Sequence, residues 1–252
     1  PRTHIVNNFS NLIQAVVLNP VTKLYAGGID FVASGLKGTQ RQHYISQVPA
    51  YYKGVANSVG DAPGEALKVL RGRQQIYRPD ISHIPTRTKI LAPFQFVPRL
   101  LEASDVFFRT LIREGEKEAL SLKAKKSGVE LTEKVLADIE KKALETAEYF
   151  VFRQPLGKIG QGKLLEGIDK ITSGVYQLRK VPLISWFIPF VQTPLNILKQ
   201  GIEYSPIGLT TIPGAVNKTE QLAKSFVGTT VLTGAGYIAM KGDSTWAPPT
   251  NE

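Results

Sequence analysis

One segment of the chain has the spacing of a phosphate-binding loop. In Gly157-Lys-Ile-Gly-Gln-Gly162-Lys163, four residues separate Gly157 from the Gly162-Lys163 pair. Such loops cradle phosphates with backbone N–H groups, and the residue after the lysine is a Ser or Thr that binds Mg²⁺. Leu164 occupies that position, and a helical pattern precedes the segment where a strand is required. We therefore interpret it as a linker between helices; a nucleotide-dependent enzyme is the alternative.

Other side chains that do chemistry are few and scattered. The chain has no cysteine, which excludes disulfide scaffolds, thiolate metal sites and cysteine nucleophiles. Its three histidines, His4, His43 and His83, share no ligand spacing. Neither a G-x-S-x-G elbow nor a His-Glu-x-x-His motif occurs. We predict a protein that is not an enzyme, with no catalytic residue, metal or cofactor.

Charged residues are distributed unevenly over the 252 residues. Of the net charge of +10, residues 1–100 carry +8 and residues 151–200 carry +5, whereas residues 127–150 carry −3. The run 113–118 alternates acids with bases, which is typical of a solvated helix face. An excess of positive charge favours binding to a polyanion, either nucleic acid or an anionic membrane. The densest basic stretch, our candidate polyanion-binding site, contains Lys68, Arg71, Arg73, Arg78, Arg87 and Lys89. A solvated loop between helices is the alternative.

The first hundred residues predict helices separated by a long connection. Residues 11–36 have a helical pattern that we expect to break or kink at Pro20. Two shorter helices, at residues 51–59 and 63–70, are separated by a Gly-Asp-Ala-Pro turn. Four prolines and no lasting period make residues 72–98 a long connection. The side chains expected to form one buried face of the first helix are Ile13, Val16, Val17, Leu24, Ile29 and Val32.

The clearest helical patterns follow at residues 99–126 and 132–150. Lys125 and Lys126 before Gly128 are typical of a helix C-terminus, and Thr132 can cap the next helix. The short link predicts an antiparallel hairpin. A third helix is expected at residues 163–179, and no alternating strands are found. The predicted class is all-α, an extended assembly of helical hairpins with long Pro-containing connections. The apolar stripes are Leu100, Phe107, Phe108, Leu111, Ile112, Ala119 and Leu122 in the first helix, and Leu136, Ile139, Ala143, Ala147 and Phe150 in the second.

Two apolar stretches near the end could meet a membrane or a partner. Residues 181–198 lack charge, but their three prolines argue against a straight membrane span, so we expect a buried connection or a shallow interfacial segment. Residues 225–240 are also uncharged and rich in small residues, and we expect a central buried helix, with membrane insertion as the alternative. The candidate membrane or partner contacts are Trp186, Phe187, Phe190, Phe226 and Tyr237.

The order of these segments resembles a helical region of very large bacteriophage proteins, namely internal virion (ejection) proteins and the large polyvalent proteins. The most specific part is the Pro-Phe-Val-x-Thr-Pro-x-Asn-Ile block at residues 189–197. The likeness also includes the opening of the hairpin at residues 99–111 and the segments 149–156, 203–208 and 236–242. It covers residues 99–242 well and residues 1–98 loosely. Gln192 departs from the pattern, since a basic residue is more usual there.

The resemblance implies a non-enzymatic virion protein with a structural, genome-delivery role. It would reside in the capsid interior or the portal and tail region, and then in the host cell envelope. Expected partners are other virion proteins or copies of itself, DNA and the host membrane, with no small-molecule substrate. The alternative is a helical module of a polyvalent protein that acts in the infected cell beside an enzymatic domain. We expect a basic N-terminal helical segment at 1–98, a helical domain at 99–252, and a longer parent chain.

Overall fold

A computed structural model describes residues 2–71, 92–154 and 188–241 of the chain. Within these three ranges the regular structure is helical and no strand is formed, which confirms the all-α class. The predicted helix at 163–179 and the segment Gly157-Lys163 lie outside the described residues. The same is true of His83.

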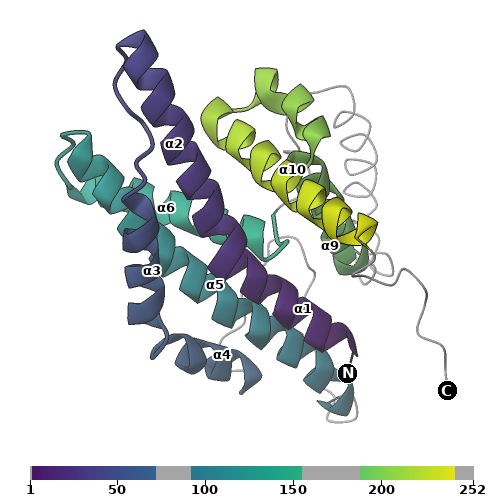
Figure 1. Ribbon diagram of the computed structural model, residues 1–252. Coiled ribbons are helices and arrows are strands. Elements are labelled where there is room, and N and C mark those ends of the chain that lie inside the picture. Colours follow the sequence, from purple (N-terminus) through teal and green to yellow (C-terminus); the bar gives the residue numbers. More distant parts are fainter. Residues whose placement is uncertain (1, 72–91, 155–187, 242–252) are drawn as a thin grey trace.

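The longest helix of the described residues, α5 (Ala92–Lys126), is the element on which α3, α4 and α6 pack. Helices α3 (Gln47–Ser58) and α4 (Ala62–Leu70) lie along α5 on one side, and α6 (Glu133–Phe150) lies against it as well (Figure 1). Both α3 and α4 match the helices expected there, and Pro63 stands in the first turn of α4, where its missing N–H has no cost. The apolar core at this junction contains Phe108, Leu111, Ile112, Ala147 and Phe150.

The start of α5 differs from the prediction. We expected a connection through Pro98 and a helix from Arg99, whereas α5 begins at Ala92. Pro93 falls in the first turn, where a helix makes no use of the proline nitrogen. Pro93 and Pro98 hid the helix start, because no lasting apolar period runs through the first two turns.

The predicted hairpin of α5 and α6 is confirmed. After Lys126 the chain turns at Gly128, whose φ of 72° is the left-handed conformation that glycine adopts without strain. The Thr132 hydroxyl then accepts a hydrogen bond of 3.5 Å from the Val135 N–H, as a helix N-cap does. Of the expected stripe on α6, the four later residues are buried, whereas Leu136 is 46% exposed.

Of the predicted break or kink at Pro20, the break is not found, and an irregular turn precedes the proline instead. Helices α1 (Arg2–Ile13) and α2 (Asn19–Lys37) are joined by a π-helical turn, η1 (Gln14–Leu18), and form one long rod (Figure 1). Pro20 offers no N–H to the carbonyl oxygen of Val16, four residues earlier. The hydroxyl of Tyr52 donates to that oxygen instead, at 2.7 Å. The π turn and a neighbouring side chain thus absorb the proline without ending the rod.

The C-terminal helices cover the rod from one side. Helix α9 (Ile188–Glu203) leads through the 3₁₀ helix η3 (Pro206–Gly214) into α10 (Lys218–Met240), which runs beside α2 (Figure 1). Gly228 permits the close approach of α10 to the turn that follows α9, because a Cβ there would overlap the backbone carbonyl of Tyr204.

Candidate interaction surface

Polar side chains, together with the small Ala15 of the apolar core, join the α1–α2 rod to α5. Glu116 of α5 is only 2% exposed, and Lys23 of α2 forms an ion pair with it at 2.8 Å. Asn19 donates a second hydrogen bond to the same carboxylate at 2.6 Å. The prediction that the run 113–118 is a solvated face is therefore wrong for Glu116. Its charge is buried because α2 brings both donors to it.

A second buried charged cluster joins α6, α9 and α10 around Glu203. The Glu203 carboxylate receives the Tyr149 hydroxyl at 2.5 Å and the ammonium groups of Lys224 at 3.3 Å and Lys199 at 3.8 Å. Burial and the adjacent Glu203 charge raise the pKa of Tyr149 well above its ordinary value. Burial alone would lower the pKa of Lys224, but Glu203 and Glu220 outweigh it and raise that pKa. Lys224 therefore stays protonated at neutral pH beside the Glu203 carboxylate.

Further polar contacts tie the rod to the C-terminal helices. Gln14 of the π turn donates to the Gln200 side chain at 3.0 Å, and the hydroxyls of Thr22 and Tyr204 lie 2.9 Å apart. Burial raises the pKa of Tyr204 to about 12, so its hydroxyl stays protonated. The face of the rod that turns inward is thus composed mainly of small and polar side chains.

The apolar residues of the rod turn outward, contrary to the prediction. Of the six expected to form a buried face, Ile13 and Ile29 are half-buried, and the other four are exposed. These residues do follow a helical period, but the side of the helix that they occupy is exposed, and the other side packs. Hydrophobic residues on a helix face usually meet a core, and here the described part of the chain places no core against them. The four exposed residues are Val16, Val17, Leu24 and Val32.

The exposed apolar side chains lie along one side of the rod. Val16 and Leu24 are eight residues apart, which would place them about 80° apart around a regular α-helix, near the two edges of one face. The π turn between them takes about one additional residue, because its hydrogen bonds run from i to i+5, and this brings the two back into line. We call the set the outer apolar surface and include the exposed residues at the end of α10. Its members are Ile5, Val6, Phe9, Leu12, Val16, Val17, Leu24, Phe31, Val32 and Leu36 of the rod, and Val231, Leu232, Tyr237, Ile238 and Met240 of α10.

Helix α10 is buried in its first half only. Ser225, Val227 and Gly228 are buried, but residues 230–238 are all exposed. The prediction of a central buried helix over 225–240 is therefore wrong for the second half, which extends past the elements that cover the first half. Phe226 and Tyr237, two of the predicted contact residues, are 46% and 55% exposed.

The structure describes the other predicted contact residues only in part. Trp186 and Phe187 lie outside the described residues, as does the rest of 181–187, and the side chains of residues 188–193 are not described. Phe190 belongs to α9, but its side chain is not described. Within the described ranges, none of the helices combines the length and hydropathy needed to cross a bilayer.

The basic stretch is described only at its start. Lys68 and Arg71 lie at the end of α4 and are exposed, and Lys68 forms an ion pair with Glu65 at 2.5 Å. Arg73, Arg78, Arg87 and Lys89 lie outside the described residues. The polyanion-binding prediction therefore stays a prediction.

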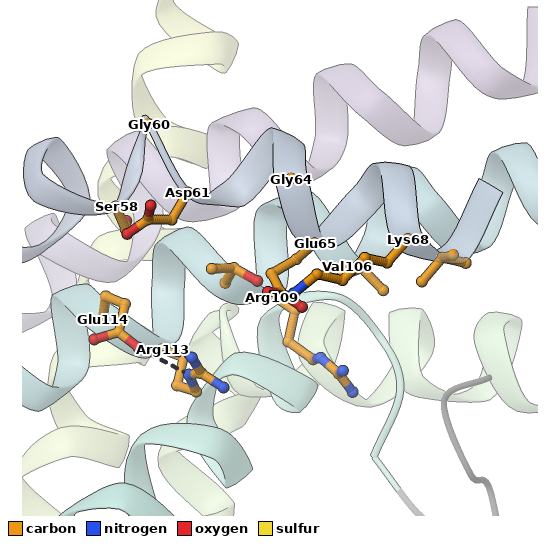
Figure 2. A pocket seen from close by; sticks show the side chains of 12 residues that line it. Ser58, Gly60, Asp61, Gly64, Glu65, Lys68, Val106, Arg109, Arg113 and Glu114 are labelled. Atoms are coloured by element: carbon orange, nitrogen blue, oxygen red, sulfur yellow. Dashed lines mark hydrogen bonds and ion pairs between the residues drawn. The ribbon is translucent and has the colours of Figure 1, made fainter. Parts of the chain in front are cut away.

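A cavity of about 600 Å³ lies between α4 and α5, close to Lys68 (Figure 2). Its lining includes Lys68, Arg109 and Arg113, but also Asp61, Glu65 and Glu114. Arg113 pairs with Glu114 at 2.8 Å. Equal numbers of acidic and basic side chains leave this cavity without the positive excess that a polyanion requires.

Comparisons with known proteins do not identify the chain: no family model, no curated protein and no solved structure matches it.

Proposed function

We propose that this chain is a non-enzymatic structural module of a bacteriophage internal virion (ejection) protein, and that its outer apolar surface contacts the host membrane during genome delivery. The observation that carries the proposal is the inverted arrangement of the α1–α2 rod. Its buried face is polar, with Asn19, Lys23 and Thr22, and its outward face is apolar, with Phe9 and Leu24.

Exposed apolar area on this scale is unfavourable in water. Burial of one Leu, Val or Phe side chain is worth about 1.5–3 kcal/mol, and large contiguous apolar patches mark contacts with proteins or membranes. Phe9, Leu36 and Met240 are 62%, 83% and 83% exposed. A surface that binds a hydrophobic partner would recover this free energy, whereas a catalytic role would leave it unexplained.

Charge favours a membrane as the partner. Lys37 and Lys241 stand at the C-terminal ends of α2 and α10, directly after Leu36 and Met240 of the outer apolar surface. Bacterial and other cytoplasmic leaflets carry anionic lipids, which attract such cations. A helix with one apolar face lies in the interface, with that face against the acyl chains. Other virion proteins, or copies of this chain, are the competing occupants.

The basic first hundred residues supply the proposed contact with DNA. Lys68 and Arg71 are exposed at the end of α4. Contacts of this kind to phosphates are independent of sequence and weaken steeply with salt. Loss of DNA binding in the double variant Lys68→Gln, Arg71→Gln at low salt would support the proposal, and unchanged binding would remove these two residues from it.

Vesicle flotation tests the membrane contact. The chain should float with vesicles, and more strongly with anionic lipid, while Phe9→Ser with Val231→Ser should reduce the floating fraction. Val59→Ser is the matched control, because Val59 is 52% exposed but belongs to the turn between α3 and α4. Absence of binding to either vesicle would remove the membrane part. A concentration-dependent dimer in light scattering, lost in the same double variant, would instead assign the surface to a second copy.

Detection of the chain in purified virions by mass spectrometry tests the virion role. Its absence from virions, together with its presence in infected cells, would favour the polyvalent-protein alternative.

A further inference from the structure

A second, smaller cavity of about 260 Å³ lies where the end of α2, the start of α3 and the end of α5 meet. It is lined by Phe31, Arg41, Tyr44, Ile45, Ser46 and Lys126. Two of these side chains are cationic and none is acidic, in contrast to the cavity of Figure 2.

Two hydrogen-bond donors at this cavity are buried without an acceptor. The Nε of Arg41 and the hydroxyl of Ser46 are shielded from solvent, and neither has a partner among the described residues. Leaving a buried donor unpaired costs about 1–3 kcal/mol, more for a charged group. Ser46 stands at the N-cap position of α3, yet its side chain caps no N–H of that helix. Both donors are thus left without an acceptor next to the cavity.

The two cations of the cavity also lack counter-charges. No described residue forms an ion pair with Arg41 or Lys126, although both approach the ring of Tyr44, at 5.2 and 5.3 Å from its centroid. Two positive charges that share one ring repel each other. Asp30, on the neighbouring turn of α2, already accepts hydrogen bonds from the backbone N–H groups of Gln42 and His43. An anion between the two cations would supply the missing counter-charge.

The aromatic walls hold the cationic groups in position. The guanidinium of Arg41 lies over the rings of both Phe31, at 4.9 Å, and Tyr44. The Tyr44 hydroxyl donates to the Arg41 carbonyl oxygen at 3.2 Å, which fixes the loop that carries both residues. Lys126 belongs to the last turn of α5, where the helix dipole favours a cation. Arginine in a fixed orientation suits the oxygens of a phosphate.

We propose that this cavity binds a phosphate group, with Arg41, Ser46 and Lys126 as its ligands, and that the phosphate belongs to a phospholipid headgroup. The lipid source rests on the proposed membrane contact. Phe31 is both a wall of the cavity and a member of the outer apolar surface, and Ile45 beside it is 47% exposed. A phosphate site bordered by exposed apolar side chains matches a molecule with an anionic head and acyl chains.

The experiment measures phosphate binding and lipid binding separately. In the first arm, inorganic phosphate is titrated into the chain and followed by amide chemical shifts. Arg41→Gln and Lys126→Gln should each weaken binding roughly tenfold, and Ser46→Ala less, since charge-assisted hydrogen bonds are about twice as strong as neutral ones. Lys125→Gln is the matched control. It removes the same charge from the same turn of α5, but Lys125 does not line the cavity. Thermal unfolding of each variant confirms that it folds.

In the second arm, vesicles with and without phosphatidic acid compete against inorganic phosphate, and a single-stranded DNA oligonucleotide is the comparison ligand. The proposal predicts that vesicles with phosphatidic acid displace phosphate from the wild type. Lys126→Gln should weaken this displacement, whereas Lys125→Gln should not. No saturable phosphate binding, or equal effects of the two lysine variants, would overturn the phosphate site. Displacement by DNA but not by vesicles would overturn the lipid source. The double variant Phe9→Ser with Val231→Ser separates the two proposals. If it still binds phosphate but no longer floats with vesicles, the phosphate site is intact and the membrane contact depends on the outer apolar surface.

Discussion

The hydroxyl of Tyr51 donates a 2.8 Å hydrogen bond to the carbonyl oxygen of Ala15, within the π turn that joins α1 to α2. Both residues are fully buried, and Tyr52, the next residue of α3, donates to the next carbonyl of the turn, that of Val16. Two adjacent tyrosines of α3 therefore satisfy carbonyl groups that the irregular turn and Pro20 leave free. The rod remains continuous because another helix supplies these donors.

Tyr51→Phe should destabilise the fold more than Tyr52→Phe. Removal of the Tyr51 hydroxyl leaves the buried Ala15 carbonyl without its donor, at a cost of about 1–3 kcal/mol. Tyr52 is 41% exposed, so water can replace its hydroxyl. Urea unfolding of both variants gives the comparison. Equal losses in the free energy of unfolding would mean that the buried hydrogen bond to Ala15 stabilises the fold no more than the exposed one to Val16.

Gly54→Ala should destabilise the chain severely. At the crossing of α3 and α5, a Cβ on Gly54 would overlap the carbonyl oxygen of Glu114, so the helices would have to separate. Gly64→Ala is the control, because Gly64 of α4 has open space around it and alanine favours a helix by about 0.8–1.0 kcal/mol over glycine. Thermal unfolding should show a lower Tm for Gly54→Ala and an equal or higher Tm for Gly64→Ala. A Gly54→Ala protein as stable as the wild type would contradict the close crossing.

Lys23→Met should remove about 3–5 kcal/mol of stability, since it leaves the buried Glu116 carboxylate without its cation. The exposed pair of Lys142 and Asp138, at 2.6 Å, provides the comparison. Lys142→Met should cost less than about 1 kcal/mol, as solvent screens that pair. Urea unfolding measures both variants. Similar losses for the two lysines would indicate that the Glu116 site is hydrated and not buried.

Acidification should weaken the contact between the α2–α3 loop and α10. Burial, and then the charge of Lys123, lower the pKa of His43 below 6.5, against smaller opposite effects of Glu220, Asp30 and the hydrogen-bonding partner Asn217. The unfolded chain therefore takes up a proton at a higher pH than the folded chain does. Stability is complete above about pH 6.5 and falls as the pH drops from there toward the pKa of the folded state.

The variant His43→Gln should flatten this part of the pH dependence of the free energy of unfolding, because glutamine does not titrate. The measurement is a series of urea unfolding curves between pH 7.5 and pH 5. An unchanged slope in the variant would show that other groups cause the pH dependence.

Helix existence and type were predictable where the apolar period was strong. The hairpin of α5 and α6 followed from its stripes, from Gly128 and from the Thr132 cap, all of which act over a few residues. The continuity of the rod through Pro20 was not predictable, because it depends on Tyr51 and Tyr52 from another helix. The start of α5 at Ala92 was missed because the sequence there shows no lasting apolar period.

The sequence pattern could not predict which face of the rod packs against the other helices. A helical period shows that the apolar residues share a face, but not whether that face meets a core. The buried Glu116 could have been found only by noticing that Asn19, Thr22 and Lys23 form a polar face of their own. The phosphate cavity was equally hidden, since Arg41, Ser46 and Lys126 come together only through the packing of α2, α3 and α5.

The absence of cysteine allows the central claim to be tested by labelling one position at a time. A polarity-sensitive fluorophore is attached to Phe9→Cys on the outer apolar surface, and to Ala137→Cys on the exposed side of α6. Emission is then recorded with and without anionic vesicles. We predict a blue shift at position 9 on vesicle binding and no shift at position 137. Bound protein whose label at position 9 stays in water, or shifts no more than the label at position 137, would contradict the account.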